Sequence, residues 1–360
     1  MAGAETESYN AFQGCVDFSR VLAIEILPSN FPAFSSLEEC SPSSILVDDT
    51  SIGVPKKVLA RAFITARHNL CGFLDASRPV VDINDTLFAT FVILLFNPEH
   101  LTAANFRKRM LLEGWKNMTG GSRGRLMLQA IRRELVVIET LLTSPLHRHT
   151  KSPTLWYHRR WVLRHFFKYL RWDEETHGSY DANWLWQHVY RLELLMAMKA
   201  GEHHPRNYYA WSYARWLFEN FRAGTDRAAL SSSLIDSMEL VQEWCLKHQS
   251  DTSGWSFLHF LYIQASKEVG LQGLVAPSAE RVLCLALSFD WDFESIWAFL
   301  RTVMASPSLL SEKQRLALVK RIREKIEETG KVEVGSECKP SVHFLQSALV
   351  WIDLYGRGEK

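Results

Sequence analysis

Four tryptophans recur at similar spacing between residues 156 and 297, each within a segment that has helical periodicity. Trp156, Trp211, Trp255 and Trp297 follow one another at intervals of 55, 44 and 42 residues. The side chains three and seven residues after each tryptophan lie with it on one face of a helix. Periods of about 40 residues are typical of stacked helical hairpins. The recurrence therefore predicts an all-α chain.

An amphipathic segment precedes each of the first three tryptophan helices, over residues 128–142, 185–195 and 234–245. The repeat unit is therefore a pair of helices. One pair cannot bury both of its apolar faces, so we expect residues 55–360 to form a right-handed α-α superhelix, a solenoid of stacked pairs. Residues 1–54 contain three prolines and serine-rich patches, which predict an irregular N-terminal arm with one short strand or bound extended segment over residues 21–27.

Composition and charge limit the classes of partner. The chain has 360 residues, of which 47% are hydrophobic, and a formal net charge of +1. This charge gives no whole-molecule field that would attract nucleic acid or an anionic membrane. The longest apolar run, residues 87–96, is half of the about 20 residues that a membrane-spanning helix needs. We therefore expect neither a nucleic-acid partner nor a membrane span.

The cysteines and the N-terminus predict a cytoplasmic protein. The six cysteines are scattered and form no Cys-x-x-Cys pair, as in a reduced intracellular chain. The first residues, Met-Ala-Gly-Ala-Glu-Thr-Glu, lack the basic start and apolar core of a signal peptide.

The sequence offers no catalytic or metal-binding motif of its own. Only His158 and His165 share one expected helix, at residues 152–167, among the clustered histidines His147, His149, His158, His165, His203 and His204. No cysteine or carboxylate lies at ligand spacing. The glycines of residues 120–124 follow no strand and precede no Gly-Lys-Ser, so they are no phosphate loop. We expect no metal site and no independent catalysis in this chain.

The segments around the tryptophans resemble the repeat of the α subunits of protein prenyltransferases, Asn-Pro-x-Asn-Tyr-x-x-Trp-x-x-Arg-Arg. The fullest copy reads His-Pro-Arg-Asn-Tyr-Tyr-Ala-Trp over residues 204–211. The resemblance covers residues 97–305. The other copies are residues 155–160, degenerate ones at residues 252–258 and 294–301, and an early one that begins at Asn97 and has Ala104 at the tryptophan position.

Within this family, the whole chain resembles most the member associated with a type-III geranylgeranyltransferase. The resemblance implies a non-catalytic α subunit of a heterodimeric protein prenyltransferase. In such enzymes the β subunit holds zinc and most of the isoprenoid pocket, and a protein cysteine near the C-terminus receives the prenyl group. The implied co-substrate is geranylgeranyl diphosphate. The partner that fits best is the β subunit of Rab geranylgeranyltransferase.

The family motif also implies roles for individual residues. A Lys-Asn-Tyr of the family repeat faces the diphosphate, and the matching positions here are Arg206, Asn207 and Tyr208. A guanidinium can grip phosphate oxygens in pairs, but Arg206 could equally pair within the solenoid. The expected structural residues of the repeats are Trp156, Arg159, Arg160, Trp211, Trp255 and Trp297, with the two arginines pairing with glutamates such as Glu134 or Glu139.

A second function remains open at this point. The chain departs from the family repeat at Ala104, Arg206, Gly254 and Ser256. These departures are compatible with a helical-repeat interaction scaffold that has no transferase role.

Overall fold

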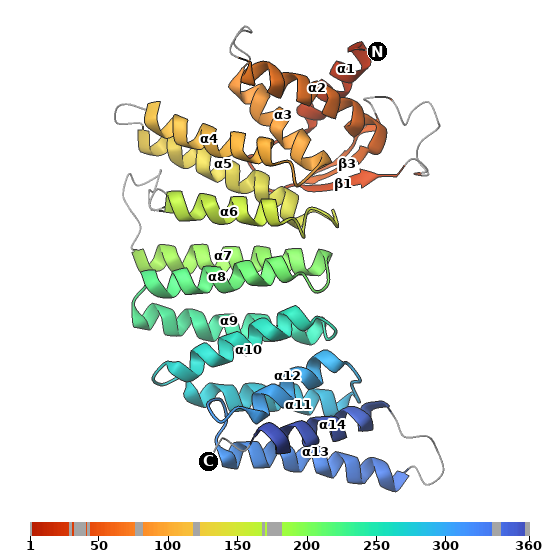
Figure 1. Cartoon of the computed structure of the whole chain (residues 1–360), viewed down its shortest axis with the longest axis vertical. Coiled ribbons are helices and arrows are strands. Elements are labelled where there is room, and N and C mark those ends of the chain that lie inside the picture. Colours follow the sequence, from red (N-terminus) through yellow and green to blue (C-terminus); the bar gives the residue numbers. More distant parts are fainter. Residues whose placement is uncertain are drawn as a thin grey trace. The chain divides into compact units, whose positions relative to one another are not determined.

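A computed structural model describes residues 2–28, 31, 41, 44–75, 82–117, 123–167, 170, 182–332 and 340–356. Within these residues the chain forms fourteen α-helices and three short strands (Figure 1). The fold is therefore an all-α helical repeat, as the sequence predicts. The chain divides into two compact units, Met1–Leu185 with Leu194–Tyr213, and Trp186–Glu193 with Ala214–Lys360. Residues 1–54 belong to the first unit.

The helical patterns of the sequence over residues 56–75, 82–96, 98–116 and 126–142 predict four helices, and the structure places a helix within a few residues of each range. The first eight helices are α1 (Ala2–Cys15), α2 (Lys56–Leu74), α3 (Ile83–Phe96), α4 (Leu101–Asn117), α5 (Arg123–Thr143), α6 (Pro153–Phe166), α7 (Ala182–His203) and α8 (Tyr208–Gly224). Those that follow are α9 (Arg227–Lys247), α10 (Thr252–Lys267), α11 (Val275–Ser288), α12 (Glu294–Ala305), α13 (Glu312–Val332) and α14 (Pro340–Tyr355).

The second helix of each pair begins at the same distance from its repeat position. Helices α4, α6, α8, α10 and α12 all start three residues before the repeat position, which is Ala104 in α4 and tryptophan in the other four. The residue just before the helix provides its N-cap. The Ser152 hydroxyl accepts a hydrogen bond from Leu155 N (3.2 Å), and the Asn207 amide oxygen accepts one from Ala210 N (3.2 Å). These caps satisfy backbone N–H groups that a helix leaves unpaired at its start.

Three of the repeat tryptophans hold the turn that precedes their own helix. The indole N–H of Trp156 donates to Thr150 O (2.9 Å), that of Trp255 to Gln249 O (2.9 Å) and that of Trp297 to Trp291 O (2.8 Å). In all three cases the acceptor lies six residues earlier. The rings themselves are buried, so each side chain contributes apolar area and also pairs its one polar atom.

Polar side chains join neighbouring turns within the first unit. Ser152 Oγ donates to Pro98 O (3.3 Å) in the turn before α4. Asn207 Nδ2 donates to Thr150 O (2.6 Å) in the turn before α6. The N-cap residue of one helix therefore holds the turn of the preceding pair, which sets the N-terminal ends of α4, α6 and α8 next to one another.

The N-terminal segment is more regular than the sequence predicts. The strand expected over residues 21–27 is confirmed as β1 (Ala23–Leu27), but residues 2–15 form a helix where an irregular arm was expected. Helix α1 buries Tyr9 and Phe12 completely. The Tyr9 hydroxyl also donates to the Asp85 carboxylate (2.9 Å). Tertiary packing against α3 holds this helix, and its own polar sequence gives little sign of it.

A small sheet completes the first unit. Its strand order is β1-β3-β2, with β1 parallel to β3 (Ser51–Pro55) and β2 (Leu46–Asp48) antiparallel to β3. The outer edge of β1 lies against α5, where Leu22 N donates to Thr140 Oγ1 (3.1 Å) and Ile24 N donates to Ser144 Oγ (2.9 Å). Hydroxyl groups of a helix thus pair strand N–H groups that an open sheet edge would leave exposed.

Gly254 departs from the family repeat for a steric reason. A Cβ at this position in α10 would lie 2.6 Å from Cζ3 of Trp244 in α9, so the indole ring occupies the space of a side chain. We expect Gly254→Ala to lower the free energy of unfolding by about 1–3 kcal/mol through overpacking. Denaturant titration followed by circular dichroism would measure it. Gly273→Ala is the matched control, because no atom lies within 4 Å of a Cβ there, and an equal loss in both variants would contradict the steric explanation.

Candidate functional site

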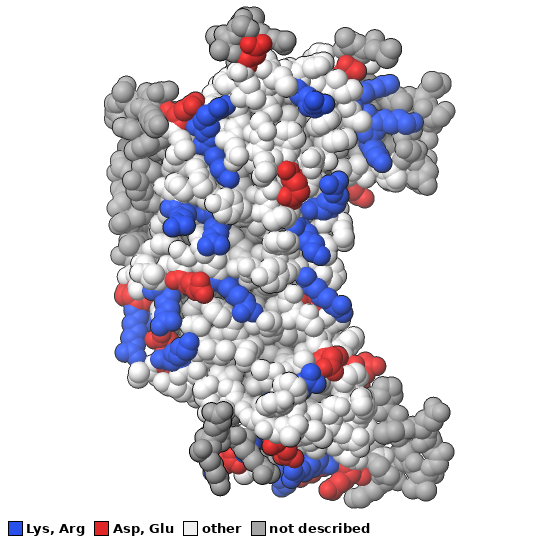
Figure 2. All heavy atoms as spheres, in the orientation of Figure 1, with Lys and Arg blue, Asp and Glu red and all other residues white. Residues whose placement is uncertain are grey.

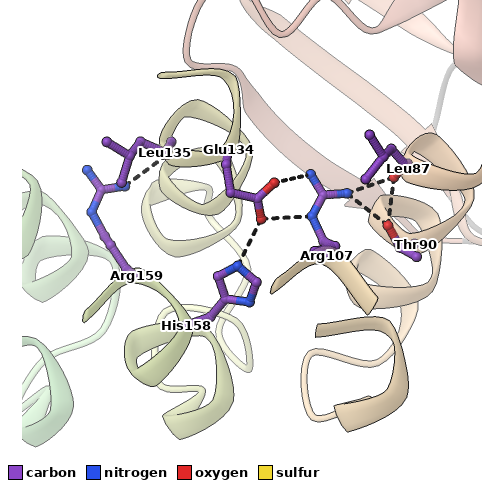
Figure 3. Close-up of polar contacts among 7 residues, drawn as sticks. All are labelled: Leu87, Thr90, Arg107, Glu134, Leu135, His158 and Arg159. Carbon is purple, nitrogen blue, oxygen red and sulfur yellow. Dashed lines mark hydrogen bonds and ion pairs between the residues drawn. The ribbon is translucent and has the colours of Figure 1, made fainter. Parts of the chain in front are cut away.

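A buried charged network joins four helices of the first unit (Figure 3). The Arg107 guanidinium of α4 makes two parallel hydrogen bonds to the Glu134 carboxylate of α5, Nε to Oε1 at 2.9 Å and Nη2 to Oε2 at 2.7 Å. His158 of α6 places its Nε2 2.9 Å from Glu134 Oε1. Arg107 Nη1 donates to Leu87 O (2.7 Å) and to Thr90 Oγ1 (2.8 Å) of α3. The network therefore links α3, α4, α5 and α6.

The network is paired well enough to remain ionised inside the protein. Arg107 and Glu134 are only 4% and 5% exposed. Burial alone would raise the pKa of the Glu134 carboxyl, but Arg107 and His158 outweigh it and hold that pKa at about 2. Burial lowers the pKa of His158 below its ordinary value, so the ring is neutral near pH 7. The network therefore contains one cation, Arg107, and one anion, Glu134, whose charges offset each other as in a structural ion pair.

Arg159 forms a second structural contact on α6. Its Nη1 donates to Leu135 O (2.8 Å), and its Nη2 donates to Glu139 Oε2 (3.1 Å). Of the two glutamates expected as partners, Glu139 takes Arg159, whereas Glu134 takes Arg107 and His158. Arg160, the next residue, is exposed. The charged residues of the Trp156 repeat thus divide between a buried face and an outer face.

His149 is buried in the turn before α6 and makes folding sensitive to acid. Its Nε2 lies 2.8 Å from Leu95 O and 3.1 Å from Leu94 O, and burial lowers its pKa from 6.5 to about 4. Between these values the unfolded chain binds a proton that the folded chain does not bind. The part of the free energy of unfolding that depends on neutral His149 is therefore fully present above pH 6.5, and it is lost as the pH falls toward 4.

We expect this loss to be about 3 kcal/mol for His149, as a depressed pKa converts to free energy at about 1.4 kcal/mol per unit. Denaturant titrations at a series of pH values measure it. His149→Gln should flatten the dependence between pH 6.5 and 4, while the steeper decline below pH 4.5 that comes from Glu134 should remain. An unchanged slope in His149→Gln would show that other groups carry the acid sensitivity.

The three residues matched to the family Lys-Asn-Tyr lie at the start of α8, but they face different surroundings. Arg206 is exposed and has a positive φ of 60°. Tyr208, the first residue of the helix, is 67% exposed. Asn207 is fully buried and acts as the N-cap described above. Arg206 and Tyr208 are thus accessible to a ligand, whereas Asn207 supports the turn.

A basic cavity of about 350 Å³ opens beside this position. It is formed by the turns before α4 and α6 and by the start of α8. Lys151 in its wall stands five residues before Trp156, the same offset at which Arg206 precedes Trp211. Lysine and arginine side chains also gather over α6 on the face seen in Figure 2. The cavity is lined by Pro98, Glu99, His147, Arg148, Lys151, Pro153 and Tyr209.

The sequence interpretation did not single out Lys151, Arg148 or Tyr209. Alignment of the repeats on their tryptophans could have identified Lys151, because Lys151 stands at the family lysine position in the copy that precedes the one with Arg206.

Neighbouring groups further shape the cavity. The His147 ring lies against that of His204 at a tilt of 34°, with centroids 4.1 Å apart, and Thr154 Oγ1 donates to the carboxylate of Glu99. Arg148 and Lys151 in the cavity wall, with the exposed Arg206 beside it, place positive charge at the N-terminal ends of helices, which favours an anionic ligand.

The described residues contain neither a metal-binding cluster nor a membrane-spanning helix. No group of three or more His, Cys, Asp or Glu side chains within them is placed to hold a metal ion. Among the same residues, no helix is both long enough and apolar enough to cross a membrane.

Two family models match the chain. Residues 131–166 match the protein prenyltransferase alpha subunit repeat. Residues 155–273 match the ECM9 middle domain. The first match covers α6 and most of α5, the helices that carry Glu134, His158 and Arg159.

The chain is similar to proteins named for the same repeat. It is 29% identical over 206 residues to protein prenyltransferase alpha subunit repeat-containing protein 1 of Danio rerio, covering 56% of this chain and 40% of that protein. The human protein of that name is 25% identical over 223 residues, covering 61% of this chain and 50% of the relative. The matches thus span half or less of the length of these relatives.

A third relative is matched over most of both chains. Geranylgeranyl transferase type-2 subunit alpha of Saccharomyces cerevisiae is 23% identical over 278 residues, which is 75% of this chain and 74% of the relative. Residues 131–166 of this chain therefore match the protein prenyltransferase alpha-subunit repeat, and the chain is similar to proteins named for that repeat and to an α subunit of a geranylgeranyl transferase.

Proposed function

We propose that this chain is a non-catalytic α subunit that assembles with the β subunit of a heterodimeric protein prenyltransferase of the geranylgeranyl type. The observation that carries the proposal is the basic cavity at the N-terminal ends of α4, α6 and α8, with Lys151 and the exposed Arg206 at equivalent positions of consecutive repeats. The relative from yeast is by name the α subunit of a geranylgeranyl transferase.

The same edge offers apolar side chains for docking. Leu101 is the first residue of α4 and is 63% exposed, and Tyr208, the first residue of α8, is 67% exposed. Tyr157, one turn into α6, is 61% exposed. Exposed aromatic and aliphatic side chains flanked by cations are typical of an interface with a more acidic partner. We name the β subunit of Rab geranylgeranyltransferase as that partner, acting in the cytoplasm.

The chain would help the reaction by binding the leaving group. In the proposed complex, zinc in the β subunit supplies a thiolate from the acceptor cysteine, which lies in the C-terminal region of the protein substrate. The diphosphate of geranylgeranyl diphosphate accumulates negative charge as its bond to the isoprenoid breaks. Lys151 and Arg206 would hold this charge in a fixed geometry, which lowers the barrier without proton transfer.

Co-expression tests the assembly. With the β subunit of Rab geranylgeranyltransferase, we expect a stable one-to-one complex that contains zinc and transfers a geranylgeranyl group to a protein cysteine. Paired replacement of Leu101 and Tyr208 by aspartate should abolish the complex while each chain remains folded. Failure of the unmodified chain to bind this β subunit, or any other prenyltransferase β subunit, would refute the proposal and favour an interaction scaffold.

A further inference from the structure

A second cavity lies beside the charged network, whose residues Arg107 and Glu134 line it. It shares no lining residue with the basic cavity before α6. Its volume is about 510 Å³, within the range of about 300–1,000 Å³ that is usual for small-molecule sites. Helices α3, α4 and α5 form its walls, and the residues that follow α1 close one side. All of its lining residues belong to the first unit.

The depth of this cavity is apolar. Phe88, Leu111 and Met127 line it and are at most 7% exposed. Methionine side chains such as those of Met110 and Met127 adapt to ligands of irregular shape. Water would find few partners on these walls, so a hydrocarbon group is the occupant that the interior fits.

The only charges at depth are already matched to each other. Arg107 and Glu134 reach the cavity wall, but their bidentate pair, with His158 and the carbonyl of Leu87, uses the polar atoms on both sides. A charged ligand group would gain no free partner there and would lose its hydration. The polar end of a ligand must therefore stay at the rim.

The rim carries one cationic side chain, that of Arg133. Arg133 lines the cavity, is exposed, and has no hydrogen bond or ion pair with any residue in the described part of the chain. Asp17 also lines the rim and keeps its negative charge, because hydrogen bonds from Ser19 N–H (2.8 Å) and Oγ (2.7 Å) to its two carboxylate oxygens lower its pKa. The amides of Gln13 and Asn84 add neutral polar groups. An anionic group at the rim would thus meet Arg133.

We propose that this cavity binds a single-chain anionic amphiphile, with its hydrocarbon chain between α3, α4 and α5 and its carboxylate or phosphate group on Arg133. This site is separate from the basic cavity at the helix N-termini, and it does not depend on the proposed pairing with a β subunit. Each methylene buried in the cavity should strengthen binding about fourfold, so affinity should rise steeply with chain length.

The test uses the purified full chain and the fluorescent fatty acid cis-parinaric acid as the probe. We expect saturable binding of one probe per chain. Displacement by oleate would assign a carboxylate head group, whereas stronger displacement by geranylgeranyl diphosphate would assign a phosphate. Octanoate should compete at least tenfold more weakly than oleate, because it buries fewer methylenes.

Three variants locate the bound probe. Arg133→Glu should weaken binding about tenfold, and Ala130→Trp, which fills the cavity from α5, should abolish it. Arg132→Glu is the matched control, since Arg132 is an exposed neighbour that does not line the cavity, and it should bind the probe normally. Circular dichroism verifies that each variant is folded. Absence of saturable binding, or equal binding by Arg133→Glu and Arg132→Glu, would overturn the proposal.

Discussion

Replacement of Glu134 by alanine is expected to lower the free energy of unfolding by about 3–5 kcal/mol. Glu134 is 5% exposed and accepts two hydrogen bonds from the guanidinium of Arg107. Without the carboxylate, Arg107 would remain buried as an uncompensated cation, and His158 would lose its partner. Denaturant titration at pH 7 gives the loss directly, with circular dichroism as the signal.

Two further variants separate charge from packing. Glu139→Ala removes the carboxylate that pairs with Arg159, but Glu139 is 30% exposed, so its loss should cost less than about 1 kcal/mol. The double replacement Arg107→Met with Glu134→Leu should recover most of the stability that Glu134→Ala loses, because a buried ion pair replaced by apolar side chains of similar volume is often neutral. Equal losses in Glu134→Ala and Glu139→Ala would contradict the buried-charge explanation.

The second large expected effect is on the rate of prenyl transfer by the proposed heterodimer. Lys151→Ala and Arg206→Ala are each expected to lower kcat/KM for prenyl transfer by about a hundredfold, with the complex still formed. One preorganised donor that meets developing negative charge typically supplies that much. The loss should fall on kcat more than on KM, because diphosphate carries more charge in the transition state than in the bound substrate.

Single-turnover kinetics with a purified complex measure this loss. Arg206→Lys should restore most of the activity, since it keeps the charge and matches the family lysine. Arg164→Ala is the control, because Arg164 is an exposed cation of α6 that lies about three turns from the N-terminal end next to Lys151. Transfer that is unchanged in both Lys151→Ala and Arg206→Ala would remove these residues from the mechanism.

The helical pairs could be predicted from the sequence because their signals are local. Proline near a helix start, an N-capping residue such as Ser152 and apolar side chains at helical spacing lie within one segment. The recurrence of tryptophan then placed these segments in a common register. The five helices that begin three residues before the repeat position show that this register holds in the structure as well.

Helix α1 and the charged network could not be predicted because their causes are not local. Tyr9 is buried by contact with Phe88 and Asp85, more than seventy residues away. Glu134 and Arg107 are separated by 27 residues, and nothing in either segment shows that they pair. Periodicity identifies the buried face of a helix, whereas the choice of partner depends on how helices are stacked.

The candidate site was predicted only in part. The family motif pointed to the start of α8, but it does not distinguish the exposed Arg206 from the buried Asn207. Lys151 occupies the equivalent position in a copy that has Ser152 and Pro153 where the motif has asparagine and tyrosine. Comparison of register between repeats, and not the match of any one repeat, identifies it.

Hydrogen–deuterium exchange of the full chain, with and without the β subunit, tests the central claim most directly. The account predicts that binding protects the turns before α4, α6 and α8, over residues 97–101, 147–153 and 204–209, and leaves exchange in α1 and the small sheet unchanged. Protection confined to α1 and the sheet, or to α9–α14, would show that the basic cavity and its exposed apolar neighbours are not the docking edge.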